Sequence, residues 1–506
     1  MTDGICRAST KLFRGIYIAL MVFVACSAAF NRESYGNNTV IVCVAAGLYL
    51  LAIAKLYRFL SGSRGAGVRG HFERTLGIMA AVLLIVELAL GFVLRFDPQW
   101  DLEAIFRGAI HWYRSGGFAD YSSETCHPRY FYIFPNNIGG LCFYYLLFSA
   151  VRLFGMGDYW LAALVVNTLL LTGTMVFSAC IAKRLWGSAA GLLCAAMFLL
   201  SPPFWFFGPV FYTDSLSMMF PAAAWYCCMR AEETEKARRA AWFAAAGLCG
   251  AIGGMIKPTV WIILIAIAVV YILRGEWKLL MTFALLSSLL VGGSQLALHS
   301  AIYPEYLDPK LAEQWNMPTE YWLALGLSDE GKYRSDYFGA AMEPEGQAEK
   351  KAVLRELIAE NVREKGFSGM LELFAKKMTR AFGDGTFALS DFLDDRPQED
   401  TILHQFVLYD GEHYKLYASL CTGILAVQLF LAALGGADGK NGIRSLPAPM
   451  ALFGLILFLS VWEVTGRYFV NYSPMIFITA VGGLVNWLPI ADEVRLKLKR
   501  NENGTA

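Results

Sequence analysis

Charged residues are scarce in this chain. Of its 506 residues, 17% are charged and 56% are hydrophobic, and the mean hydropathy is +0.45. Soluble globular proteins carry about a quarter charged residues, so this composition excludes that class and indicates a polytopic membrane protein. The net charge is +1, and no basic tract or zinc-finger spacing is present, so the sequence gives no sign of nucleic-acid binding.

A disulfide framework and internal repeats are also lacking. Most of the 11 cysteines lie inside apolar runs, where cysteine behaves as a small hydrophobic residue. The basic N-terminus before the apolar stretch 16–30 imitates a secretory signal. A second apolar run, 40–60, follows at once, so we expect a membrane anchor instead.

Apolar runs of roughly 17 to 25 residues mark helices that can cross a bilayer. We predict an all-α polytopic membrane protein with about 12–13 transmembrane helices and one external, mostly helical loop domain. The twelve predicted spans are 12–30, 39–59, 76–94, 159–181, 189–207, 209–229, 240–256, 258–273, 278–299, 414–434, 446–462 and 470–489.

The segment 130–151 is the candidate for a thirteenth span. A full crossing there would place Asp214 on the cytoplasmic side and Lys183 outside, against the distribution of positive charge. Pro135 and the Asn136-Asn137 pair interrupt helical hydrogen bonding. We therefore expect this segment to lie at the membrane interface or to enter and return.

Lys and Arg concentrate in four loops or tails, at 55–74, 230–239, 440–444 and 495–500. The positive-inside rule makes these segments cytoplasmic, as in a multi-pass protein of the bacterial cytoplasmic (inner) membrane with both termini inside. Counting spans from them places the suggestive polar groups together on the external face.

The predicted spans divide the chain into four parts. Residues 1–75 form an N-terminal transmembrane hairpin, and 76–299 form a transmembrane module with a first external loop at 95–129. An external loop domain follows at 300–413, and 414–506 hold the C-terminal transmembrane helices and a cytoplasmic tail. The amphipathic stretch 366–382 either lies on the membrane or packs on the core of the protein.

Two acids at the external face are candidate catalytic residues. Asp101 follows the span that ends at 94, and Asp214 lies in Phe211-Tyr-Thr-Asp-Ser215. A carboxylate there suits removal of a proton from an acceptor hydroxyl. Asp97 is a third candidate, although an N-cap of the helix that begins near Pro98 explains it better than catalysis does. Asp101 also has a structural alternative, as a first-turn acid favoured by the helix dipole.

Cations at the same face are candidates for binding a donor phosphate. Lys257 ends a span, and Arg467 with Tyr468 follows another. A guanidinium grips phosphate with two parallel hydrogen bonds. Snorkelling anchors at helix ends are the structural alternative for Lys257 and Arg467. Further cations, Lys376, Lys377 and Arg380, lie on the amphipathic stretch.

These residues resemble the GT-C superfamily of membrane glycosyltransferases, in particular bacterial relatives of protein O-mannosyltransferases and aminoarabinose transferases. The resemblance covers most of the chain after residue 76, so it identifies 76–299 as GT-C-like. It rests on the order of several motifs: Asp101 with Ala109 and Gly116, the aromatic-Pro-Asn-Asn run 132–137, the Tyr-Thr-Asp of Asp214, Met317-Pro-Thr with Gly326-Leu, and Arg467-Tyr-Phe. The N-terminal hairpin and the absence of an adjacent Asp-Glu pair in the first loop depart from the family.

The resemblance implies inverting transfer of a sugar from a polyprenyl-phosphate donor on the external face, with the first-loop acid as general base. The acceptor it implies is a cell-envelope polymer, a glycolipid or a protein. Some members of the superfamily use a divalent metal such as Mg or Mn and others do not. Asp101 and Asp214 are the residues that would hold one.

Two other functions remain open from the sequence. A transporter or flippase of lipid-linked sugars would explain Glu87, an acid roughly 15 Å inside the bilayer by helix geometry. A neutral, hydrogen-bonded Glu between helices is the structural alternative. A non-catalytic scaffold would use 300–413 to bind a partner and would tolerate substitution of Asp101.

Overall fold

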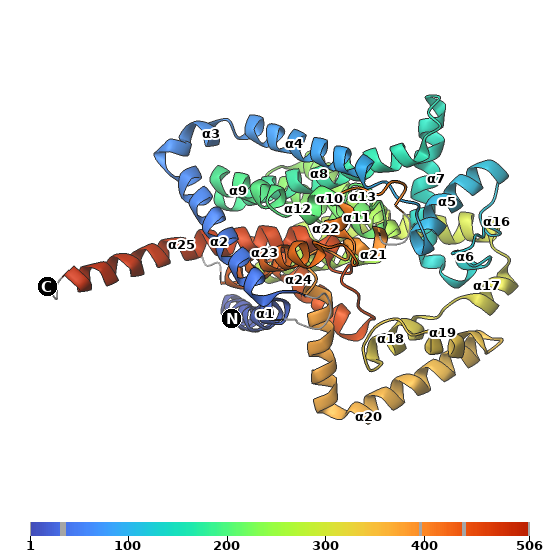
Figure 1. Ribbon diagram of the computed structural model, residues 1–506. Coiled ribbons are helices and arrows are strands. Elements are labelled where there is room, and N and C mark those ends of the chain that lie inside the picture. The colour runs from blue at the N-terminus through green and yellow to red at the C-terminus, as the bar shows by residue number, and fades with distance from the viewer. Residues whose placement is uncertain (1, 31–36, 394–396, 438–441, 504–506) are drawn as a thin grey trace.

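The protein is built from helices (Figure 1). The computed structural model describes residues 2–30, 37–393, 397–437 and 442–503. Within these ranges no strand forms, and the β contact present is an isolated bridge between Phe96 and Pro397. The predicted all-α class is therefore confirmed.

Eight helices in the described part of the chain are long and apolar enough to cross a membrane. They coincide with eight of the predicted spans, and in Figure 1 α4 and α25 show the common direction of the bundle. These helices are α1 (Thr2–Ala29), α2 (Thr39–Ser61), α4 (Phe72–Val93), α8 (Tyr159–Trp186), α13 (Lys236–Ile256), α15 (Trp277–Ala297), α23 (Tyr414–Gly435) and α25 (Ser473–Asn503).

The other four predicted spans fall on shorter helices. They are α9 (Ser188–Leu199), α11 (Thr213–Ser217) continuing into α12 (Met219–Glu232), η3 (Pro258–Val260) continuing into α14 (Trp261–Arg274), and α24 (Pro447–Val461). The boundaries predicted at 189–207 and 209–229 are wrong, because α9 ends before Ser201-Pro-Pro. The short helix α10 (Pro203–Phe206) follows, and α11 begins only at Thr213. Proline lacks the N–H that helix continuation needs.

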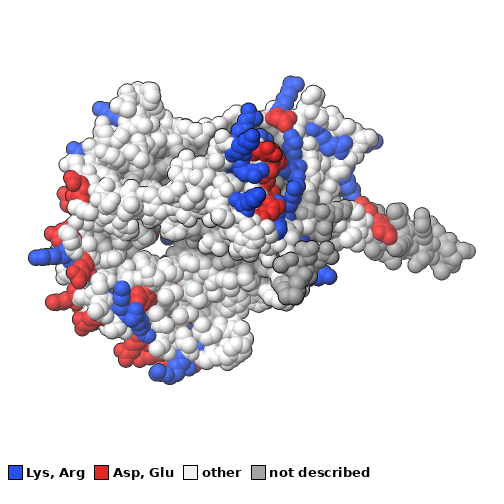
Figure 2. Space-filling model, turned by 180° about the vertical axis from the view of Figure 1, so that it is seen from behind, with Lys and Arg blue, Asp and Glu red and all other residues white. Residues whose placement is uncertain are grey.

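The surface of the bundle is apolar where lipid would contact it. Exposed aliphatic side chains recur at helical spacing on α4 (Ile78, Val82, Ile85) and on α15 (Met281, Leu285, Leu289). Charged residues gather toward the two ends of the molecule, with a surface of few charges between them (Figure 2). This distribution is typical of a polytopic membrane protein.

The N-terminal helices α1 and α2 pack on α23, which lies about four hundred residues later in the chain. Gln428 of α23 donates hydrogen bonds of 2.9 Å to the hydroxyls of Tyr49 and Ser201. The two terminal regions of the sequence therefore share one interface.

The segment predicted at the interface forms α6 (Tyr130–Ile133), η2 (Pro135–Asn137) and α7 (Ile138–Leu153). None of these belongs to the candidate membrane spans of the described chain. In Figure 1 α7 runs across the direction of α4 and α25. Gly139 allows α7 to approach α13, because a Cβ there would lie 2.0 Å from the carbonyl oxygen of Met255.

The predicted loop domain is helical (Figure 1). Its part 309–366 lies beside the bundle, whereas 389–393 and 404–407 pack in the core of the bundle. Its helices are α16 (Tyr303–Tyr306), α17 (Pro309–Trp315), α18 (Thr319–Leu327), α19 (Ser335–Met342), α20 (Gln347–Phe382), α21 (Leu389–Leu393) and α22 (His404–Val407). A small separate core joins it to α6, since Ile133 packs with Met317 and Tyr321.

Helix α20 bends at Gly366, whose φ of 55° lies in the left-handed region that favours glycine. Beyond the bend, Met378 and Phe382 are buried, and Phe374 stacks on Phe23 of α1. Leu371 remains exposed. The amphipathic stretch thus packs one side on the protein and leaves part of its apolar stripe uncovered.

The close contact between α23 and α25 should depend on Gly483. A Cβ at this position would lie 1.9 Å from the carbonyl oxygen of Leu431. We expect Gly483→Ala to cost about 1–3 kcal/mol through overpacking. The melting temperature of the purified protein in detergent measures this. Gly292→Ala on α15 is the matched control, because nothing lies within 4 Å of its Cβ position. Equal melting temperatures for the two variants would contradict this packing.

Candidate active site

Asp101 is the centre of a polar cluster. It lies in the first turn of α5 (Trp100–Ser115), and its carboxylate accepts hydrogen bonds from the hydroxyls of Tyr130 at 2.6 Å and Tyr212 at 3.1 Å. The guanidinium of Arg467 is 3.7 Å from the same carboxylate. With 38% of its side chain exposed, Asp101 is open to a substrate while its orientation is fixed.

The backbone before Asp101 is strained. Trp100 has a φ of 52°, which is unfavourable for a residue with a side chain. The strained turn begins α5 at Trp100, so Asp97 is not its N-cap; Gln99 takes that position without a side-chain hydrogen bond. The N-cap interpretation of Asp97 is therefore wrong.

Asp214 and Lys257 form an ion pair at the start of α11 and the end of α13. The Asp214 side chain is 1% exposed and that of Lys257 is 14% exposed. The second carboxylate oxygen of Asp214 is buried and has no hydrogen-bond partner among the described residues. Burial of a carboxylate is costly without a cation beside it, so each residue requires the other.

Arg467 joins this pair to Asp101. Its guanidinium stands 4.9 Å from the ring centroid of Tyr212 and interacts electrostatically with both Asp101 and Asp214. Lys257 in turn lies 5.2 Å from the ring centroid of Tyr468. The structure therefore brings five of the six predicted site residues together: Asp101, Asp214, Lys257, Arg467 and Tyr468.

Tyr468 donates a hydrogen bond to Glu463. Burial raises the pKa of the Glu463 carboxyl, while the bond from Tyr468 and the charge of Arg467 act in the opposite direction. Glu463 thus adds an acid beside Arg467, and it binds the Tyr468 side chain whose ring lies next to Lys257.

Tyr130 is a site residue that was not predicted from the sequence. Tyr130 lies between Asp101 and Asn137, whose amide donates to the Tyr130 hydroxyl at 2.5 Å. Burial and the neighbouring Asp101 raise the pKa of Tyr130 well above its usual range, so Tyr130 stays protonated as a donor. The signal available was the polar Asn pair within an apolar run, which indicates a buried hydrogen-bonding partner.

Asp97, the sixth predicted residue, faces another direction. It lies 3.5 Å from Arg107 and accepts a 3.2 Å hydrogen bond from Gln398. A cavity of about 270 Å³ lies beside it, lined by residues that include Glu103 and Arg107 but not Asp101. Asp97 and Asp101 therefore have different neighbours, and Asp97 lies outside the polar cluster around Asp101.

The cluster is not arranged as a cation site. Asp101 is already bound by two hydroxyls and a guanidinium, and Asp214 is paired with Lys257. No group of three or more His, Cys, Asp or Glu in the described chain is positioned to hold a metal. The positive charges of Arg467 and Lys257 next to these carboxylates would oppose the binding of Mg or Mn.

The cations expected on α20 have local partners. Lys376 pairs with Glu372 at 2.8 Å, and Arg380 donates to the carbonyl of Glu330. The Lys377 ammonium is buried and donates to the carbonyls of Gly326 at 2.7 Å and Ser460 at 2.9 Å. Lys377 thereby fastens the loop domain to the end of α24.

The family comparison places the chain among integral membrane proteins. A family model described as "conserved hypothetical integral membrane protein" matches residues 4–484, and the chain belongs to this family. A search of the curated proteins finds no match.

Two similar solved structures are those of ArnT from Cupriavidus metallidurans. The structure bound to undecaprenyl phosphate is 12% identical with a TM-score of 0.36, over 81% of this chain and 77% of that chain. The apo structure is 14% identical with a TM-score of 0.35, over 81% and 76%.

Removal of one partner should reveal how far the Asp214–Lys257 pair stabilises the fold. Breaking a buried pair from one side costs about 3–5 kcal/mol, so Lys257→Met should lower the melting temperature strongly. The double variant Asp214→Asn with Lys257→Met should recover most of the loss, because no lone charge then remains buried. A Lys257→Met protein as stable as the wild type would contradict the pair.

Stability should also depend on pH through Lys377. Burial lowers its pKa to about 7, below that of a lysine in the unfolded chain. The unfolded state then binds more protons between about pH 7 and pH 10, so stability rises with pH across this window. The melting temperature of Lys377→Met should rise less with pH than that of the wild type. The matched control Lys376→Met should keep the wild-type slope, and equal slopes for all three proteins would contradict a lowered pKa.

Proposed function

We propose that this protein is a membrane glycosyltransferase that moves a sugar from a polyprenyl-phosphate donor to an acceptor on the external face of the bacterial cytoplasmic membrane. The observation that supports this most directly is the position of Asp101, a partly exposed carboxylate held by two tyrosines beside Arg467. An acid and two cations at one end of an apolar bundle suit a reaction between a hydroxyl and a lipid-linked phosphate.

Asp101 acts as the general base in this proposal. It removes the proton of an acceptor hydroxyl, whose oxygen attacks the anomeric carbon of the donor from the face opposite the phosphate. The bond between the anomeric carbon and the phosphate oxygen breaks, so the sugar is transferred with inversion and polyprenyl phosphate leaves. Tyr130 and Tyr212 hold the carboxylate in place.

Arg467 and Lys257 are the proposed contacts of the donor phosphate. Negative charge grows on the departing phosphate as the bond breaks, and cations fixed beforehand stabilise it without reorganisation. Tyr468 lies against both cations, with ring centroid distances of 5.8 Å to Arg467 and 5.2 Å to Lys257. Asp214 keeps Lys257 in position.

The proposed acceptor is a cell-envelope polymer, a glycolipid or a protein.

A transporter or flippase of lipid-linked sugars is the second candidate, and Glu87 is the observation that favours it. This acid is fully buried in α4, and one carboxylate oxygen has no hydrogen-bond partner among the described residues. The other oxygen accepts from Thr172 at 3.4 Å. An intramembrane acid of this kind suits a proton or ion pathway.

Substitution of Asp101 tests the transferase directly. Purified wild type should move a radiolabelled sugar from polyprenyl-phosphate donors to a crude cell-envelope acceptor. Loss of a general base lowers the rate by about 100-fold or more, so Asp101→Asn should abolish most transfer. Asp97→Asn is the matched control, since it removes the same charge from the same loop outside the cluster.

The outcomes separate the candidates. Transfer that survives Asp101→Asn would remove Asp101 as the base. An absence of transfer with any donor, together with movement of a labelled polyprenyl-phosphate sugar across proteoliposomes that Glu87→Gln abolishes, would favour the flippase.

A further inference from the structure

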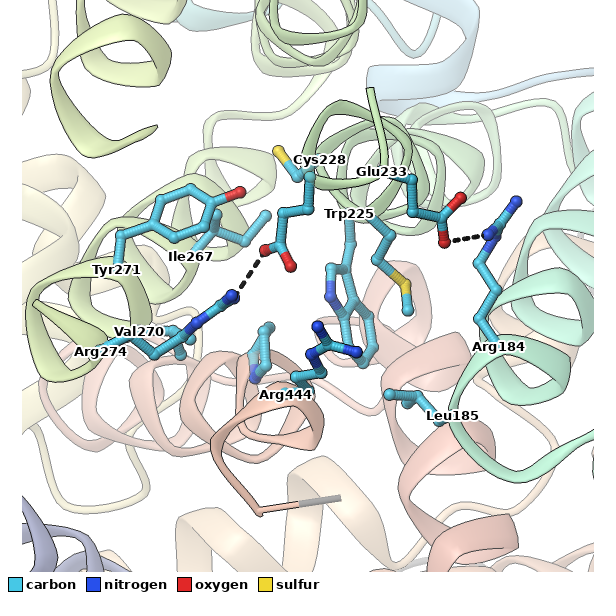
Figure 3. A pocket seen from close by; sticks show the side chains of 13 residues that line it. Arg184, Leu185, Trp225, Cys228, Glu233, Ile267, Val270, Tyr271, Arg274 and Arg444 are labelled. Carbon is cyan, nitrogen blue, oxygen red and sulfur yellow. Dashed lines mark hydrogen bonds and ion pairs between the residues drawn. The ribbon is translucent and has the colours of Figure 1, made fainter. Parts of the chain in front are cut away.

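Figure 3 shows a second polar cavity. It lies at the end of the bundle opposite the cluster around Asp101. Its volume is about 110 Å³, and its walls come from α8, α12, α14 and the start of α24. Helices α12 and α14 connect the two places. Asp214 and Lys257 precede these helices, whereas the cavity is lined by residues near their last turns.

Three arginines from different elements converge on this cavity: Arg184, Arg274 and Arg444. Arg184 pairs with Glu233, and Arg274 lies 2.7 Å from Glu232 and 2.6 Å from Glu276. Both are in the last turn of a helix, where the dipole favours a cation. Local structure therefore accounts for these two residues.

Local structure does not account for Arg444. It lies in η5 (Gly442–Ser445), directly before the amino end of α24, where the helix dipole disfavours a cation. The described residues supply no ion-pair partner for it. In Figure 3 its side chain points into the cavity beside Trp225. The walls hold three guanidiniums and two carboxylates, and Glu276 beside Arg274 adds a third carboxylate. Arg444 is the guanidinium of the cavity without an ion-pair partner among the described residues.

The remaining walls add donors and flat surfaces. Tyr271 is 1% exposed, and its hydroxyl lies next to Glu232 and Cys228 in the cavity wall. Each guanidinium has five N–H donors, so the paired arginines retain some that are not used by glutamate. A phosphate offers acceptor oxygens to all of these groups and the charge that Arg444 lacks.

We propose that this cavity binds a phosphate group, held by Arg444 with Tyr271 and the arginines beside it. Basic residues mark this end of the protein as cytoplasmic by the positive-inside rule, at the depth where anionic lipid headgroups lie. The phosphate comes either from such a headgroup or from free phosphate in solution. A ligand here would connect the ends of α8, α12, α14 and α24. This inference does not depend on the proposed transferase activity.

Binding of a fluorescent phosphatidylglycerol to the full-length protein in neutral detergent tests the site. Arg444→Gln should bind about tenfold more weakly, because a charge-assisted hydrogen bond to the phosphate is lost. Arg444 is exposed, so the variant should fold, and gel filtration with circular dichroism checks this. Arg238→Gln is the matched control, an exposed arginine of the same end that does not line the cavity.

Inorganic phosphate distinguishes the two sources. Displacement of the lipid by inorganic phosphate, or a rise in melting temperature that Arg444→Gln removes, would support free phosphate as a ligand. Lipid binding that depends on Arg444 and is unaffected by inorganic phosphate would support a headgroup. Equal binding by wild type and Arg444→Gln, or equal weakening by both variants, would overturn the site.

Discussion

The polar cluster around Asp101 depends on the ion pair between Asp214 and Lys257. Neither charge is tolerable alone among apolar helices, so the start of α11 and the end of α13 must meet. Tyr212 precedes Asp214 by two residues, and it reaches Asp101 only when α11 is held there. The pair thus determines the surroundings of Asp101 without contacting it in the described structure.

The helical class and the positions of eight of the twelve predicted spans could be read from the sequence, because bilayer thickness imposes a length on apolar runs. The exact ends of the helices could not be read from the sequence. The break after Leu199 follows from Ser201-Pro-Pro, whereas the late start at Thr213 depends on how residues 200–212 fold back into the protein. Such a buried return has no periodic signature in sequence.

The site was predictable in its charges and not in its hydrogen bonds. Because charged residues are few near the predicted spans, the sequence indicated Asp101, Asp214, Lys257 and Arg467 as candidates. These residues lie together in the structure. Tyr130 looked like one aromatic residue of an apolar run, and only the folded chain brings it to Asp101. The strained φ of Trp100 also has no sequence signal, yet it directs Asp97 and Asp101 to different sides.

The short apolar helices have a consequence for the surrounding lipid. The 17 residues of Pro258–Arg274 and the 15 of Pro447–Val461 span roughly 25 Å and 22 Å, against a hydrocarbon thickness of about 30 Å. Lys257 precedes the first and Arg467 follows the second. In the proposed transferase, hydrophobic mismatch at these helices would thin the adjoining leaflet or admit water. The cationic groups would then lie below the general level of the membrane surface, within lateral reach of a lipid phosphate that never leaves its leaflet.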